Sequence, residues 1–98
     1  MMHGYIIVDV NIKDMEGFME YASRIPELIE KHGGRYLVKG AEPKVIRESS
    51  DAPQFLVVIE FPSVVAADDF IDERSKSELI EIFNRSTVGR MLRVEGCT

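Results

Sequence analysis

Residues 55–61 read FLVVIEF, and this stretch carries the strongest strand signal in the chain. Short runs of β-branched and aromatic residues that end at a proline are typical of strands. A sheet with one face in water should alternate apolar and polar residues, but here both alternating sets are apolar apart from Glu60. One set comprises Phe55, Val57, Ile59 and Phe61, and the other begins with Leu56 and Val58. The stretch therefore predicts a strand that buries both of its faces.

The N-terminal third of the chain predicts a strand followed by one long helix. Residues 4–11 (GYIIVDVN) have strand composition, whereas residues 14–32 change to a helical period. The inward stripe of this helix, within roughly 40° of Phe18 on a helical wheel, comprises Phe18, Ala22, Ile25, Ile29 and His32. Asp14 can cap its start, and Pro26 predicts a bend rather than a break. Gly33 is expected to end the helix with a positive φ.

The remaining segments complete a regular alternation of strands and helices. Residues 35–40 (RYLVKG) predict a strand that residues 43–49 (PKVIRES) continue after a break, and residues 49–54 (SSDAPQ) predict a loop. A second helix is expected over residues 63–73, with Ser63 as its cap. Ser75 and Glu78 have the spacing of a capping box, which predicts a new helix start before LIEIFNR. Residues 89–96 predict the last strand.

The order βαββαβ predicts an α+β, ferredoxin-like fold, in which a four-stranded antiparallel sheet carries helices on one face. The chain has 98 residues, of which 45% are hydrophobic and 30% are charged. This length and composition are typical of one globular domain. We therefore expect a single domain over residues 1–98.

Composition also argues against several classes of function. The net charge of −5 and the scattered basic residues are unfavourable for binding a phosphate backbone, so nucleic acid is not an expected partner. One cysteine, Cys97, and two histidines, His3 and His32, make a metal centre built on these residues implausible. The apolar stretch near the N-terminus is too short for a signal peptide or a membrane span. A cytoplasmic location without membrane attachment is the resulting expectation.

Strands that are apolar on both faces predict self-association. Strand 4–11, like strand 55–61, has apolar residues on both faces: Tyr5 and Ile7 on one, and Ile6, Val8 and Val10 on the other. One set of helices can cover only one face of the sheet, and the second would expose a larger apolar patch than soluble monomers normally tolerate. A curled sheet covered by loops is the alternative, but few loop residues are available for it. We expect a homodimer in which sheet packs on sheet.

Four segments together resemble a known family. They are PELIEKHGGRYLVKG (26–40), FLVVIEFPS (55–63), the alanine pair in SVVAADDF (63–70) and VEG (94–96). Their combination is similar to the uncharacterised family catalogued as domain of unknown function 1330. The resemblance implies a ferredoxin-like dimeric α/β barrel, related to the small antibiotic-biosynthesis monooxygenases. It brings no established reaction.

The chain departs from this family in two places. Members usually carry a Ser-x-x-Tyr-like stretch after the second helix, whereas DERSKSEL (72–79) has serines but Leu79 and no tyrosine. Members also tend to have arginine where this chain has Lys39. A bidentate anion clamp at that position would become a point charge.

Five residues are the candidates for a site. His32 ends the inward stripe, where a neutral imidazole can move a proton; the alternative, which the residues alone favour, is that it caps the last carbonyls of its helix. Arg35 and Arg85 can hold substrate oxygen charge, or form surface ion pairs of little energetic weight. Glu60 is a candidate for a substrate contact, because a charge on a strand that is apolar on both faces needs a partner, although interface pairing explains it equally. Tyr36 offers a phenol to such a pocket, although a tyrosine on a strand is more often simple packing. His32 and Arg35 are the candidate catalytic residues.

Three functional hypotheses follow. By analogy of fold, the resemblance implies a cofactor-independent oxygenase or isomerase that acts on a small organic acid or phenol. The second is a non-catalytic module that binds a small ligand, and the third is a purely structural dimer. A cleft beside His32 and a buried charge would favour ligand chemistry.

Overall fold

The strand at residues 55–61 lies inside a four-stranded antiparallel sheet. The computed structural model describes residues 2–47 and 55–98. In chain order its elements are β1 (Gly4–Ile12), α1 (Met15–Lys31), β2 (Arg35–Ala41), β3 (Phe55–Phe61), α2 (Val64–Ser75), α3 (Leu79–Ser86) and β4 (Thr87–Glu95). The strand order is β2-β3-β1-β4, with every neighbouring pair antiparallel. This is the predicted α+β, ferredoxin-like arrangement, with the second helix divided in two.

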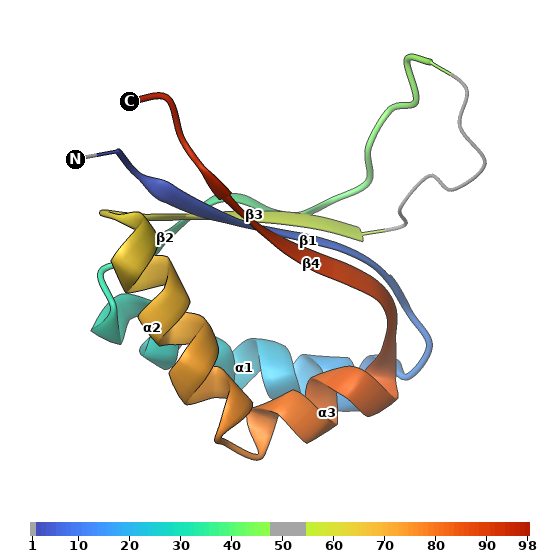
Figure 1. The fold of residues 1–98 in the computed structure, drawn as a ribbon. Coiled ribbons are helices and arrows are strands. Elements are labelled where there is room, and N and C mark those ends of the chain that lie inside the picture. The colour runs from blue at the N-terminus through green and yellow to red at the C-terminus, as the bar shows by residue number, and fades with distance from the viewer. Residues whose placement is uncertain (1, 48–54) are drawn as a thin grey trace.

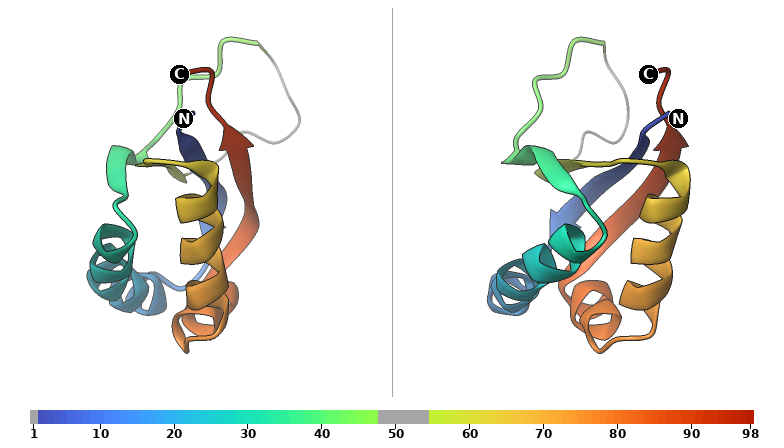
Figure 2. Two further views of the ribbon diagram at one scale, coloured as in Figure 1. Left: turned by 60° about the vertical axis from the view of Figure 1, so that its left-hand side comes forward. Right: turned by 90° about the vertical axis from the view of Figure 1, so that its left-hand side faces the viewer.

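The helices form one layer that covers a single face of the sheet (Figure 1). Figure 2 shows the sheet and the helices as separate layers, with the second face of the sheet bare of helices. None of the described helices combines the length and hydropathy that a membrane crossing requires. The side chains that meet between the layers form the core. The strands contribute Ile6, Val8, Val10, Val57, Ile59 and Phe61, and the helices contribute mainly Phe18, Tyr21, Ile25, Ile29, Phe70, Leu79, Ile82 and Phe83.

Helix α1 begins and ends at the predicted signals. The Asp14 side chain accepts a hydrogen bond from the Gly17 amide, and the helix runs unbroken through Pro26; the bend there stays a prediction. At its end Gly33 has φ +79°. The amides of Gly33 and Gly34 bond back to the carbonyls of residues 30 and 29, each at 2.9 Å, which is the Schellman arrangement. The two glycines therefore act as a helix stop that starts β2.

The prediction of a strand over residues 43–49 was wrong. Residues 42–47 belong to no strand, and residues 48 and 49, like the expected loop 49–54, lie outside the described residues. The pairing of β2 ends with Ala41 opposite Leu56, and β3 begins at Phe55, so it offers no partner to later residues. Two register shifts in β2 and a positive φ at Gly40 turn the chain away. Segment 42–47 rises from the sheet on the side opposite the helices (Figure 1).

A new helix starts near residue 78 as predicted, but the expected capping box is absent. Helix α2 continues through Ser75, whose hydroxyl donates to the Ile71 carbonyl, and Glu78 makes no side-chain cap bond. Ser77 performs the connection instead. Its Oγ accepts from the Leu79 amide at 3.2 Å and donates to the carbonyl of residue 74 at 2.9 Å. The short turn lets α3 pack beside α1 and lead directly into β4 at Thr87.

Candidate functional site

A cavity of about 220 Å³ lies between the helix layer and the sheet. Its sheet side includes Val57 and Ile59 of β3, and its helix side includes Ala22 of α1 and the rings of Phe70 and Phe83. Ala22 has the smallest side chain of the lining residues. The lining is mostly apolar, so the cavity suits a small organic molecule more than a hydrated ion.

Strand β2 supplies two polar groups to this cavity. Tyr36 and Lys39 both line it, and the Lys39 ammonium lies 5.0 Å from the centre of the Tyr36 ring. Lys39 is also exposed, so the cavity reaches solvent beside it. Burial, followed by the proximity of Tyr21, raises the pKa of the Tyr36 phenol. Tyr36 therefore stays neutral and can donate a hydrogen bond to a ligand.

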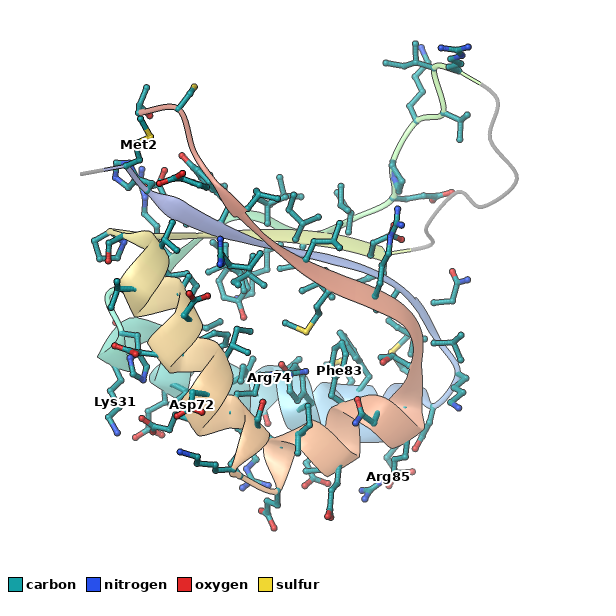
Figure 3. All side chains as sticks on the ribbon, viewed as in Figure 1. Met2, Lys31, Asp72, Arg74, Phe83 and Arg85 are labelled. Carbon is teal, nitrogen blue, oxygen red and sulfur yellow. The ribbon has the colours of Figure 1, made fainter. Side chains whose placement is uncertain are left out.

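A buried arginine lies behind two of the rings that line the cavity. Arg74 of α2 is 3% exposed, and its Nε donates to the Tyr21 hydroxyl at 2.8 Å. Its guanidinium carbon lies 4.7 Å from the ring centre of Phe83 and 5.6 Å from that of Tyr21, both of which line the cavity. Figure 3 shows Arg74 pointing from α2 into the interior toward Phe83.

The hydrogen bonding of this guanidinium is incomplete. The Nη2 atom of Arg74 is buried and has no hydrogen-bond partner among the described residues. Tyr21 remains a neutral phenol, because burial raises its pKa more than the charge of Arg74 and its hydrogen bond lower it. A neutral hydroxyl and two aromatic faces thus surround a positive charge that is removed from water.

His32 lies at the junction of α1 and α2 and does not line the cavity. Its Nε2 is 3.1 Å from a carboxylate oxygen of Glu73, whose second oxygen accepts from Lys31 at 2.9 Å. The hydrogen bond from Lys31, followed by that from His32, lowers the pKa of Glu73. The His32 ring also packs edge-on against Phe70, with centres 6.4 Å apart. The cluster joins the end of α1 to α2.

Glu60 and Arg35 lie on the face of the sheet that points away from the helices. Glu60 alternates along β3 with Ile59 and Phe61, which face the core. It accepts hydrogen bonds from Arg35 Nε at 2.9 Å and from the Tyr5 hydroxyl at 3.0 Å. These bonds, with that from Arg35 the stronger influence, lower the pKa of Glu60. The pair is therefore on the opposite side of the sheet from the cavity.

The structure does not bring the five predicted site residues together. Of these, only Tyr36 lines the cavity, and Arg85 is exposed in the last turn of α3, pointing outward (Figure 3). Across the described residues, no three His, Cys, Asp or Glu side chains gather in a metal-binding arrangement. Functional roles for His32, Arg35, Glu60 and Arg85 stay predictions.

The sequence analysis missed Arg74 and Tyr21. Arg74 follows Ala67 by seven residues and Phe70 by four, so it falls on the buried side of α2. A charged residue on an apolar helical stripe is the signal that would have singled it out. Tyr21 lies three residues after Phe18 and four before Ile25, just outside the narrow stripe assigned to α1.

Comparisons with known proteins agree with this architecture. A family model described as "Domain of unknown function (DUF1330)" matches residues 3–97. No match to the chain was found among curated proteins. The crystal structure of RPA0582, a protein of unknown function from Rhodopseudomonas palustris, superimposes with a TM-score of 0.77 at 15% identity, covering 99% of this chain and 84% of that one. The methylated form of RPA0582 gives 0.76 at 15% identity, over 99% and 82% of the two chains. At this identity the likeness concerns the fold alone.

Proposed function

Since the chain belongs to the DUF1330 family, whose description names no reaction, we propose its function from the cavity: the protein binds a small, largely apolar molecule between its helices and its sheet. The supporting observation is a space of about 220 Å³ lined mostly by apolar side chains, with Tyr21, Tyr36 and Lys39 as the residues of the lining that carry polar groups. Cavities of roughly 150 Å³ with apolar walls bind benzene. The space therefore suits a molecule built on one ring or a short branched chain.

The geometry favours the binding module over the cofactor-independent oxygenase or isomerase. Either reaction needs a group that accepts a proton from the bound molecule. His32, the candidate for this role, lies outside the cavity lining and contacts Glu73 instead. Tyr36 does line the cavity, but its raised pKa makes it a poor base at neutral pH. A catalytic role on a small organic acid or phenol is the second candidate function.

We also propose that the protein is a homodimer, with a second copy covering the face of the sheet that the helices leave bare. That face carries Ile7, Val58, Leu92 and Val94, of which Leu92 and Val94 are 41% and 40% exposed. Two ion pairs lie on the same face, Arg35–Glu60 at 2.9 Å and Arg90–Asp9 at 3.3 Å. A twofold interface joins the same patch on both copies, and a face with apolar residues and both signs of charge can pair with a second copy of itself. The resemblance to dimeric α/β barrels supports the same arrangement.

A titration followed by NMR tests the proposed binding. Benzyl alcohol added to the 15N-labelled protein should shift the amide signals of cavity residues such as Val57 and Phe83 in a saturable manner. Replacing Ala22 with Leu should fill the cavity and abolish the shifts. Met19→Leu, at an exposed position of the same helix, is the matched control and should leave them unchanged. Equal shifts in the wild type and in Ala22→Leu would exclude the cavity as the site where benzyl alcohol binds.

A further inference from the structure

Arg74 carries a charge for which the described residues supply no counterion. Its side chain is 3% exposed, and none of the ion pairs found among these residues includes it, whereas Arg24, Arg35, Arg90 and Arg93 each pair with a carboxylate. Removing an unpaired charge from water is strongly unfavourable. The Tyr21 hydrogen bond and the two aromatic rings offset part of this penalty.

A purely structural role would not require an arginine at this position. Apolar residues of similar volume often replace buried charged groups with no loss of stability, or with a gain. Position 74 is surrounded by Tyr21, Phe83 and the apolar stripe of α2, where a methionine would pack without the penalty of a buried charge. The charge therefore points to a negatively charged group that binds next to it.

The location of the guanidinium identifies where that group would be. Its carbon lies within 4.7 Å of the centre of the Phe83 ring, and its Nε is hydrogen-bonded to Tyr21. Both rings are part of the cavity wall. Arg74 itself lies behind this wall, and the two rings pack with their centres 4.9 Å apart. A ligand in the cavity therefore meets the unpartnered Nη2 atom when these rings part. A planar carboxylate matches the donor geometry of a guanidinium.

We infer that the cavity selects a monocarboxylate with an apolar body, such as an aromatic or branched-chain acid, and that Arg74 binds its carboxylate. The inference rests on the proposed binding function and adds the chemical class of the ligand. The apolar lining accommodates the body of the molecule, and the single buried cation limits the ligand to one buried negative charge. Lys39 is a second cation and lines the cavity from β2, but it is exposed to water, where an ion pair contributes little.

Two probes of nearly equal shape separate the inference from the proposed function. Benzoate and its neutral analogue benzamide are titrated into the wild type, and binding is measured by calorimetry and by NMR. Benzoate should bind about ten- to a hundredfold more tightly, the usual effect of a hydrogen bond to a charged group. If benzamide binds as tightly as benzoate, the inference is wrong while the cavity remains a binding site. If benzoate, benzamide and benzyl alcohol all fail to bind, the proposed function itself is wrong.

Substitution of Arg74 provides the second test. Arg74→Met should lose the preference for benzoate, whereas Arg24→Met, which removes a surface guanidinium from α1, should keep it. Without ligand, the loss of the buried Tyr21 hydrogen bond in Arg74→Met opposes the gain from removing an unpaired buried charge, so the variant should unfold near the denaturant midpoint of the wild type. With ligand, benzoate should raise the unfolding midpoint of the wild type but not that of the variant. A variant that is unfolded or strongly destabilised would show that Arg74 is structural and would overturn the inference.

Discussion

Replacing Leu92 with glutamate should separate the proposed dimer into monomers. Leu92 lies on β4 opposite Ile7 of β1, and its neighbour Met91 packs against the core. Because side chains alternate along a strand, Leu92 points to the face of the sheet that the helices leave bare. It is 41% exposed in the single chain. In a sheet-to-sheet dimer this exposed part would be buried in both copies.

The size of the effect follows from this exposure. Full burial of a leucine side chain stabilises by roughly 1.5–3 kcal/mol, so burial of the exposed part contributes about 1 kcal/mol in each copy. Leu92→Glu removes this contribution from both copies of the dimer. It also places one carboxylate from each copy in the interface. An ion removed from water is disfavoured by several kcal/mol in real proteins. A total of at least about 4 kcal/mol corresponds to a roughly thousandfold weaker dimer.

Sedimentation velocity over a range of protein concentrations measures this change directly. The wild type should sediment as a dimer at micromolar concentration, and Leu92→Glu as a monomer. Val65→Glu is the matched control, since Val65 is 66% exposed on α2, in the helix layer away from this face. The control should remain dimeric, and circular dichroism should show the same secondary structure in all three proteins.

Two results would refute this reasoning. A wild type that sediments as a stable monomer at micromolar concentration would mean that the bare face is tolerated in water. A Leu92→Glu variant that dimerises as tightly as the wild type would mean that the copies associate through another surface.

Three further predictions concern the helix ends and one surface ion pair. Gly33→Ala should lower the free energy of unfolding by about 1–2 kcal/mol in urea titrations, because alanine is strained at φ +79°. Gly33→Asn should lower it by less. Equal stability of the wild type and both variants would contradict the assigned helix stop. Ser77→Ala should destabilise by about 0.5–2 kcal/mol through loss of the α3 cap, while Ser75→Ala changes little; the reverse order would support the capping box expected from the sequence. The hydrogen bond from Arg35 holds the pKa of Glu60 below its ordinary value of 4.5. The contribution of Glu60 to the free energy of unfolding is therefore complete above pH 4.5 and is lost as the pH falls through the lowered pKa. Glu60→Gln should therefore unfold with a weaker dependence on pH in this acid range, and an unchanged acid limb would argue against the pair.

Local sequence signals predicted the elements whose ends depend on neighbouring residues. Asp14 and Gly33 bound α1 as expected, because a cap and a positive-φ glycine act within one helical turn. The apolar run of β3 identified a strand because the composition of a strand is also a property of one short segment. The expected strand over residues 43–49 failed, since a strand also needs a partner, and β3 begins too late in the chain to provide one.

The candidate site depended on the tertiary structure much more strongly than the helices and strands did. His32 and Tyr36 are four residues apart in the chain, yet only Tyr36 lines the cavity. Glu60 and Arg35 do meet, as a charge on an apolar strand suggests, but on the other face of the sheet. Sequence spacing indicates which residues share a face of one helix or strand. It does not indicate which helices and strands enclose a cavity.

The sequence by itself determined the order of strands and helices, the ferredoxin-like class and the two-faced apolar character of β1 and β3, because periodicity and capping are properties of short segments. Only the tertiary structure decided where the cavity lies and that Arg74 of α2 meets Tyr21 of α1 and Phe83 of α3 beside it. These contacts join residues from three separate helices. Their positions depend on how the helices pack on the sheet, which no single segment encodes.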